Sequence, residues 1–328
     1  MNAHPDPDRH PTMKNILVLG GTGFVGRSVC ERLVEGDAAT RLTVATRRLA
    51  HARPVQFLPT VDPVECDVHD DPQLARLVAG HDAVVNLIAI LHGSAADFEK
   101  VHVRLARRLA GACAAAGVTR LVHVSALGVG PDAPSNYLRS KAEAEAILRA
   151  APLQLSVLRP SVIFGAGDSF LNLFAALQSV FPVMPLAGVD ARFQPVWVED
   201  VSEALLRCLE RKDSIGKTYE CAGPQIFTLG ELVRLAGRLC GHERPVVALP
   251  ESLGKLQAAA MELMPGVPLM SRDNILSMRV PNVATGQWPG LDALGITPSS
   301  LHAVAPSYLS PGQGVARFNR WRSLRAGA

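Results

Sequence analysis

The chain has 328 residues, 48% of them hydrophobic, which is enough for the core of one large globular domain or two modest ones. Lysine and arginine number 33 against 30 aspartates and glutamates, and so even a balance argues against nucleic acid as the partner. The six cysteines are widely scattered with no CxxC pair, which gives no metal-ligand spacing and is typical of reduced thiols in a cytosolic protein.

The first twelve residues are polar and rich in proline, and they lack the apolar core of a secretory signal. We expect a disordered extension over residues 1–12, and Met13, directly before the first predicted strand, is a candidate for the native start. No apolar run in the sequence approaches the roughly 18 residues needed to cross a bilayer. We therefore expect a cytoplasmic protein that is at most peripheral to the inner membrane.

A glycine-rich loop follows the first predicted strand. The apolar run from Ile16 to Leu19 predicts a strand, and the apolar periodicity from Phe24 to Val34 predicts a helix. Glycines between them allow a sharp turn and a close approach of the backbone to a pyrophosphate. The alternative is a tight strand-to-helix turn without a ligand. The predicted phosphate-binding residues are Gly20, Thr22, Gly23, Phe24, Val25 and Gly26.

The second predicted strand, residues 42–45, ends at Thr46, Arg47 and Arg48. In dinucleotide-binding folds an acidic residue at this strand end binds the 2′-hydroxyl of the adenosine ribose. Here two arginines stand in its place, and they can pair with a 2′-phosphate. The sequence therefore favours NADP(H) over NAD(H), the alternative being that both arginines are solvated loop residues.

The third and fourth predicted strands add further candidates. Residues 61–66 lead into Asp67 and Val68, where a carboxylate could accept a hydrogen bond from adenine, although Asp67 could equally cap the helix that begins near Asp71. Residues 83–88 form a buried strand interrupted by Asn86, whose amide needs partners. Asn86 and the adjacent Leu87 are therefore candidate cofactor contacts.

A tyrosine and a lysine four residues apart follow the fifth predicted strand. Residues 98–116 predict a long helix ended by Gly117, and residues 121–124 predict the strand that leads to Ser125. Tyr137 and Lys141 lie on one face of the next helix. A lysine beside a phenol lowers the phenol's pKa, so Tyr137 could exchange a proton with a substrate whose oxygen Ser125 holds. The alternative is a helix face without chemistry.

The sixth predicted strand, residues 155–158, leads to a turn that contains Pro160, Ser161 and Val162. Because ligands gather at the carboxyl ends of parallel strands, this turn lies where a nicotinamide would bind. The alternation of strands and helices predicts an α/β fold with a doubly wound, Rossmann-type parallel sheet over residues 13–165.

The remaining half is predicted to be smaller and mostly helical. A helix begins near Trp197, and residues 217–240 return to a strand-and-helix pattern, so that 197–240 partly rejoin the first domain. Segment 168–196 is apolar and loop-like, and we expect 166–196 and 241–310 to form a substrate or lid region. Leu253 to Met264 predicts a buried helix over the substrate, with a lid, a docking surface or an interfacial membrane helix as alternatives. Residues 311–328 form a basic tail that could contact anionic lipid or an acidic partner.

These motifs together resemble the extended or atypical short-chain dehydrogenase/reductase superfamily, whose bacterial members include epimerase/dehydratase-like proteins. Within this superfamily, the chain most resembles the branch that contains alpha subcomplex subunit 9, the NADPH-binding accessory subunit of respiratory NADH:ubiquinone oxidoreductase. It covers residues 13–310 and is most specific over 83–200. The stretches that carry it are VVNLIAIL, RLVHVSALGV, NYLRSKAEAEAIL, LRPSVIFGAGDSFLNLFA and QPVWVEDVSEAL.

The resemblance implies a tightly held NADPH, with the phosphate-reading role carried to Arg47 and Arg48 and a catalytic triad of Ser125, Tyr137 and Lys141. Tyr137 and Lys141 are also candidate cofactor contacts, because Lys141 is expected to hold the nicotinamide ribose. In that branch the nucleotide is thought to support the assembly of a membrane enzyme. Two hypotheses follow. The first is an NADP(H)-dependent oxidoreductase or epimerase with an unknown small-molecule substrate, and the second is a non-catalytic accessory or assembly factor for respiratory complex I or a quinone-pathway complex.

Overall fold

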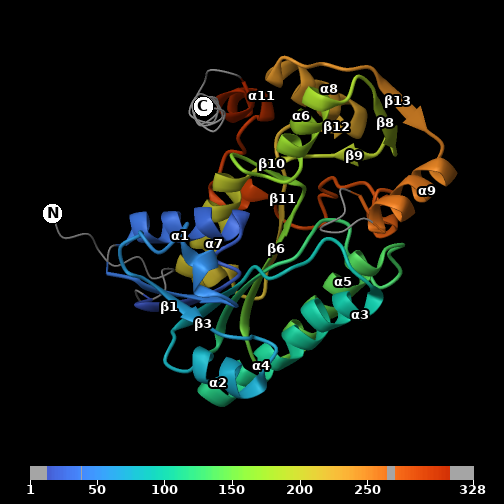
Figure 1. The fold of residues 1–328 in the computed structure, drawn as a ribbon. Coiled ribbons are helices and arrows are strands. Elements are labelled where there is room, and N and C mark those ends of the chain that lie inside the picture. Colours follow the sequence, from blue (N-terminus) through green and yellow to red (C-terminus); the bar gives the residue numbers. More distant parts are fainter. Residues whose placement is uncertain (1–12, 38, 264–269, 311–328) are drawn as a thin grey trace. The chain divides into compact units, whose positions relative to one another are not determined.

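In the computed structural model, which describes residues 13–37, 39–263 and 270–310, the chain divides into two compact units (Figure 1). Unit 1 comprises Met1–Pro160, Glu199–Cys221 and Thr285–Ile296, and unit 2 comprises Ser161–Val198, Ala222–Ala284 and Thr297–Ala328. The predicted extension over residues 1–12, the basic tail and Met264 lie outside the described residues.

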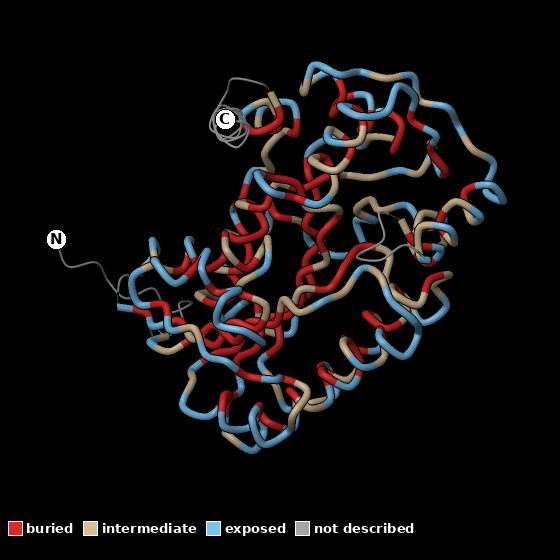
Figure 2. The backbone as a smooth tube through the Cα atoms, viewed as in Figure 1, coloured by how far each residue is buried: buried red, intermediate tan, exposed pale blue. Residues whose placement is uncertain are grey.

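Unit 1 is built on a sheet of seven parallel strands in the order β3-β2-β1-β4-β5-β6-β11. This order, with β1 between β2 and β4, is that of a doubly wound Rossmann fold, so the predicted fold class is confirmed. The inner strands β1, β4, β5 and β6 are mostly buried, as parallel strands covered on both faces require, whereas the edge strand β3 is largely exposed (Figure 2). Their bounds are β1 Asn15–Leu19, β2 Arg41–Thr46, β3 Val61–Glu65, β4 Ala83–Asn86, β5 Arg120–Val124, β6 Gln154–Pro160 and β11 Thr218–Cys221.

Helices cover both faces of this sheet (Figure 1). On one face lie α2 (Asp71–Val78), α4 (Leu105–Ala116) and α5 (Asn136–Ala150), which bury one continuous core that includes Leu17, Leu109 and Leu121. On the other face α1 (Phe24–Gly36) runs beside α7 (Val198–Glu210). Short 3₁₀ turns occupy Leu49–Ala52, Lys212–Ser214 and Leu291–Leu294.

The helix predicted over residues 98–116 is interrupted. A short α3 (Ala95–Phe98) leads into a π-helical segment, Glu99–Arg104, and only then into α4. Gly117 ends α4 in the left-handed conformation, φ 69°, as predicted. β4 ends at Asn86, two residues earlier than expected, and α5 already begins at Asn136, where Ser135 caps it by accepting from the Leu138 N–H at 3.2 Å.

Unit 2 corrects the prediction of a loop over residues 168–196. That segment contains α6 (Leu171–Val180), which packs against α8 (Leu229–Cys240) around a second apolar core. Short strand pairs connect the helices. They are β7 (Ile163–Phe164) with β10 (Val196–Trp197), β8 (Met184–Ala187) with β13 (Val246–Leu249), and β9 (Arg192–Phe193) with β12 (Phe227–Thr228). The remaining helices are α9 (Glu251–Glu262), α10 (Arg272–Ser277), α11 (Leu301–Val304) and α12 (Pro306–Leu309).

The compact units divide the chain differently from the domain limits expected above. Helix α8, expected to rejoin the nucleotide-binding domain, belongs to unit 2, whereas the segment from Thr285 to Ile296 belongs to unit 1. The Glu220 carboxylate holds that segment, because it accepts from the backbone N–H groups of Thr285 at 2.8 Å and Gly286 at 2.9 Å.

Helix α9 is not the buried helix that the sequence favoured. Only Gly254 and Ala258 are buried, whereas Leu253 is 51% and Leu256 is 67% exposed. A lid, a docking surface and an interfacial helix remain predictions for this segment. No helix within the described residues is long and apolar enough to cross a membrane.

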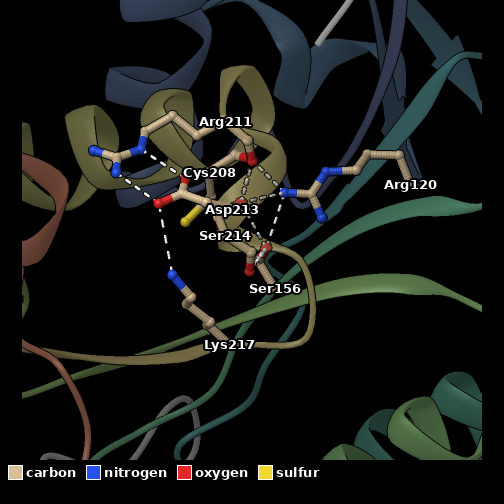
Figure 3. A network of polar contacts seen from close by, with 7 residues as sticks. All are labelled: Arg120, Ser156, Cys208, Arg211, Asp213, Ser214 and Lys217. Carbon is tan, nitrogen blue, oxygen red and sulfur yellow. Dashed lines mark hydrogen bonds and ion pairs between the residues drawn. The ribbon is translucent and has the colours of Figure 1, made fainter. Parts of the chain in front are cut away.

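A buried arginine joins β5, β6 and the end of α7 at the amino edge of the sheet (Figure 3). The Arg120 guanidinium donates to the Gln154 carbonyl at 2.5 Å, to the Ser156 hydroxyl at 2.9 Å and to the Cys208 carbonyl. Burial lowers its pKa to about 10, so Arg120 remains charged at neutral pH. Nearby Arg211 pairs with Asp213 at 2.7 Å, but this pair is largely exposed.

We expect Arg120→Ala to lower the free energy of unfolding by about 3 kcal/mol, because it leaves buried carbonyl and hydroxyl groups without donors. Arg211→Ala, which removes an exposed ion pair from the same region, should cost only about 0–1 kcal/mol. Urea denaturation of both variants measures the difference. Equal losses would contradict the role assigned to Arg120.

Candidate functional site

The predicted cofactor residues of unit 1 lie at one edge of its sheet. Leu19, the last residue of β1, is level with Ala45 of β2 and with Asn86, the last residue of β4. Asn86 is level in turn with His123 of β5. Because all seven strands are parallel, the glycine loop, Arg47, Asn86 and Ser125 all follow carboxyl ends of neighbouring strands, with the loop at the switch point between β1 and β4.

The glycine loop is packed so tightly that side chains cannot replace its glycines. Gly20 has φ +86°, and its carbonyl accepts from the Gly23 N–H at 3.1 Å. A Cβ on Gly26 would lie 2.2 Å from the Gly20 oxygen, and one on Gly20 would lie 3.2 Å from the carbonyl carbon of Leu87. Gly20 and Gly26 thus allow the backbone of the loop, residues 20–26, to pack closely on itself and on Leu87, and we call this tight turn the cradle because it is the form expected of a pyrophosphate-binding turn.

The first turn of α1 is suited to an anion. Gly23 is its N-cap, no side chain caps the helix, and no acidic residue lies in the first turn. Backbone N–H groups and the positive end of the helix dipole thus face the loop without a competing carboxylate. Thr22, Phe24 and Val25 are partly exposed there.

Arg47 and Arg48 follow β2 as exposed side chains, and no ion pair joins either to a carboxylate within the described part of the chain. The buried Thr46 hydroxyl donates to the Arg48 carbonyl at 3.0 Å, which fixes the backbone where the arginines leave the strand. Both guanidinium groups are therefore available to an anionic ligand at this strand end.

Asp67 does not cap α2, so that alternative is wrong. The cap is Asp70, which accepts from the Gln73 N–H at 2.9 Å. The Asp67 carboxylate instead accepts from the N–H of His69, and the Val68 side chain is buried in the core.

The Asn86 amide is held within the sheet edge. Its oxygen accepts from the Ile88 N–H at 3.2 Å, so its nitrogen must donate to Nδ1 of His123, also at 3.2 Å. The neighbouring Leu87 N–H donates to the Leu19 carbonyl at 2.9 Å. Asn86 and Leu87 thus join the exit of β4 to the strand that precedes the glycine loop.

Ser125 and Lys141 meet at the end of β5. The Lys141 ammonium, 1% exposed, donates to the Val124 carbonyl at 2.6 Å. Ser125 is anchored by its own N–H, which donates to the Leu158 carbonyl at 2.7 Å. Its buried hydroxyl has no hydrogen-bond partner among the described residues. Tyr137 lies one turn before Lys141 on α5, and its ring contacts those of Phe98 and His102 edge-on.

Burial dominates the electrostatics of this cluster. Desolvation lowers the pKa of Lys141 to about 8, with Glu145 acting in the opposite direction. Desolvation also raises the pKa of Tyr137 to about 12, which is opposite to the lowering by Lys141 that the sequence predicted. The physical reason is a comparison of two free energies. Removing the phenolate of Tyr137 from water costs more than the Lys141 ammonium, which is already bonded to the Val124 carbonyl, regains by attracting it.

The turn after β6 is divided between the units. Pro160 closes β6 in unit 1, where its carbonyl accepts from the Leu127 N–H at 3.0 Å. Ser161 and Val162 belong to unit 2, where the Asn282 side-chain oxygen accepts from the Ser161 hydroxyl at 2.7 Å and from the Val162 N–H at 2.8 Å. A contact of these three residues with nicotinamide remains a prediction.

Three buried polar residues near Tyr137 were missed from the sequence, namely His102, His123 and Ser140. His123 interrupts the apolar run LVHV as Asn86 interrupts AVVNLI, and the same reasoning would have found it. His102 and Ser140 gave no such signal, since both lie in helical segments rich in polar residues.

Comparison with known proteins agrees with this geometry. A family model described as NAD(P)H-binding matches residues 20–168. The mouse protein "NADH dehydrogenase [ubiquinone] 1 alpha subcomplex subunit 9, mitochondrial" is 31% identical over 291 residues, 87% of this chain and 76% of the mouse protein. The chain belongs to the alpha subcomplex subunit 9 family.

Two further proteins are also similar to this chain. A protein named ceramide reductase from Caulobacter vibrioides is 28% identical over 75% of this chain and 76% of its own length. The solved structure of UDP-glucuronic acid 4-epimerase from Bacillus cereus, in complex with UDP-glucuronic acid and NAD, superposes with a TM-score of 0.63 at 17% identity, over 86% of this chain and 96% of the epimerase. At this level of identity, the superposition shows that the two proteins share a fold.

We expect Gly26→Ala to destabilise the protein and abolish nucleotide binding, because the new Cβ would lie 2.2 Å from the Gly20 oxygen. Gly111→Ala on α4 is the matched control, since a Cβ there meets nothing within 4 Å and alanine stabilises an exposed helix by about 0.5–1 kcal/mol. Thermal unfolding with and without NADPH measures both. A Gly26→Ala variant that still gains stability from NADPH would contradict the packing argument.

Proposed function

We propose that this family member is an NADP(H)-dependent oxidoreductase or epimerase that acts on a hydroxyl or carbonyl group of a small molecule. The observation that carries the proposal is the buried Ser125 hydroxyl, which has no hydrogen-bond partner among the described residues and lies beside the carbonyl to which Lys141 donates. A buried polar group without a partner costs free energy, so a ligand atom is its natural partner.

The residues present fit a bound dinucleotide. The glycine cradle and the uncapped first turn of α1 would hold the pyrophosphate, and the exposed Arg47 and Arg48 would hold a 2′-phosphate. The nucleotide, when bound, would supply or accept a hydride. The same strand ends would place its nicotinamide half toward Ser125.

The chain's own groups would then manage the proton and the substrate oxygen. Ser125 would donate to that oxygen and hold it. Tyr137 would give it a proton, or take one in the reverse direction. Lys141, whose pKa is lowered to about 8, remains mostly protonated at neutral pH and would stabilise the phenolate that forms. Burial raises the pKa of Tyr137, so the phenol carries the proton that it would donate.

The preference for NADP(H) is tested with two arginine variants. We expect Arg47→Ala and Arg48→Ala each to weaken NADPH binding about tenfold, the worth of a charged hydrogen bond, while NADH binding is unchanged. Arg76→Ala, which removes an exposed arginine of α2, is the control. Fluorescence titration gives the dissociation constants, and mass spectrometry of nucleotide released from the denatured protein gives the cofactor's identity. Release of NAD alone would overturn the preference.

Catalysis is tested by following bound NADPH with a panel of quinones, ketones and nucleotide sugars. For any substrate that turns over, we expect Tyr137→Phe to reduce kcat about 100-fold or more, since general acid catalysis contributes that much. The affinity of the same variant for NADPH should change little, which serves as the internal control. Undiminished turnover by Tyr137→Phe would contradict the assigned role.

A second candidate function is that of a non-catalytic NADPH-binding accessory factor. Two observations favour it: membership of the alpha subcomplex subunit 9 family, and the exposed leucines of α9, which suit a respiratory-complex partner or a membrane surface. Retained NADPH, no turnover with any member of the panel and co-purification with respiratory subunits would together support this candidate against the enzyme.

A further inference from the structure

His102 lies at the centre of the π-helical segment Glu99–Arg104 and is 4% exposed. π-Helical turns are rare and often occur at functional sites. Both ring nitrogens have partners from other parts of unit 1. The Ile90 N–H donates to Nε2 at 3.1 Å, and Nδ1 lies 2.8 Å from the Ser140 hydroxyl.

These contacts determine which atom carries each proton. Because Nε2 accepts from a backbone N–H, the proton of the neutral ring is on Nδ1, which donates to the Ser140 oxygen. Ser140 then donates to the Tyr137 carbonyl at 2.9 Å. One directed chain of hydrogen bonds thus runs from the exit of β4 through His102 and Ser140 to the backbone of Tyr137.

His102 also contacts the Tyr137 side chain. Their ring centroids are 5.7 Å apart at an interplanar angle of 76°, and Phe98 packs edge-on against the same tyrosine ring at 6.2 Å. The imidazole therefore touches Tyr137 from two directions, through its backbone by way of Ser140 and through its ring directly. Such edge-to-face contacts fix the orientation of an aromatic ring.

His102 is not suited to proton transfer. Burial, and secondarily the charge of Lys141, lower its pKa to about 3, so the ring stays neutral at physiological pH. A neutral imidazole with both nitrogens in use is a rigid connector, with a donor at one end and an acceptor at the other.

We propose that His102 is a positioning residue that sets the orientation of Tyr137 relative to the exit of β4. The proposal rests on the proposed function in so far as Tyr137 faces a substrate. The exit of β4 is also bonded to the strand that leads into the glycine loop, since the Leu87 N–H donates to the carbonyl of Leu19, the last residue of β1. Through His102, the position of Tyr137 is therefore linked to the same segment after β4 that lies beside the cradle.

Two substitutions of His102 test separately the hydrogen bonds made by its two ring nitrogens. The side-chain amide of His102→Asn reaches the position of Nδ1 and can still donate to Ser140, whereas that of His102→Gln extends toward Nε2 and loses the Ser140 bond. Ser140→Ala breaks the chain at the next residue with little change in volume. Ser202→Ala is the matched control, because it removes a buried hydroxyl–hydroxyl bond of 2.7 Å to Ser28, on the face of the sheet that α1 and α7 cover.

The readout is ¹⁹F NMR of the full chain labelled with 3-fluorotyrosine, in which the three tyrosines give three signals assigned by Tyr→Phe variants. We expect Ser140→Ala and His102→Gln, which break the bond between His102 and Ser140, to shift or broaden the Tyr137 signal. His102→Asn, which loses the Ile90 N–H bond and the ring contact, should shift or broaden it as well. Ser202→Ala should leave it in place. The signals of Tyr219 and Tyr308 should not move. An unchanged Tyr137 signal in both Ser140→Ala and His102→Gln, or an equal change in Ser202→Ala, would overturn the proposal.

If a substrate that turns over is found, steady-state kinetics give a second, separate test of the positioning role. Ser140→Ala should then reduce kcat about tenfold or more with little change in KM or in NADPH affinity, as misplacement of a catalytic group does. An unchanged kcat would contradict the positioning role even if the NMR signal moved. If no substrate turns over, the proposed enzymatic function fails, while the NMR experiment still decides whether His102 positions Tyr137.

Discussion

The site depends on how closely the backbone packs around the carbonyl of Gly20. That carbonyl accepts from the Gly23 N–H, and the missing Cβ of Gly26 leaves the space in which it lies. The positive φ of Gly20 turns the chain toward Leu87, whose N–H is bonded to the last residue of β1. The cradle, the start of α1 and the exit of β4 are therefore one rigid structure, and groups attached to any of them keep a fixed relation to a bound nucleotide.

Buried polar groups lie at both edges of the central sheet. At the amino edge, the terminal nitrogens of the Arg120 guanidinium donate to carbonyl and hydroxyl groups of β6 and α7, which joins β5 to both elements, while its Nε has no partner among the described residues. At the carboxyl edge, the Ser125 hydroxyl and Nε2 of His123 are buried without partners among the described residues. The Ser125 hydroxyl differs from the Arg120 Nε in that its residue makes no other side-chain hydrogen bond, which leaves it available to a ligand atom.

Local sequence predicted what local interactions determine. Short apolar runs located most of the first six strands, although the third, VDPVE, is mixed in polarity, and the glycine pattern located the cradle. Helix α6 was missed because LNLFAALQSV has too little polar contrast to show a helical period. The docking of residues 285–296 on unit 1 depends on Glu220, some 65 residues earlier in the chain, which no local pattern reveals. The pKa of Tyr137 was misjudged for a similar reason, since desolvation by the whole fold outweighs a lysine four residues away.

Burial at the carboxyl edge also bears on the choice between enzyme and accessory factor. A protein that only retained a nucleotide would need the cradle and the arginines, and alanine in place of Ser125 would avoid a buried hydroxyl without a partner, worth about 1–3 kcal/mol. Lys141 likewise loses hydration when buried, and a shorter apolar residue would fill the core at lower cost. The chain keeps both groups together with Tyr137. A substrate oxygen that completed the hydrogen bonds would account for their combined cost, and this argument supports the proposed enzyme over the accessory factor.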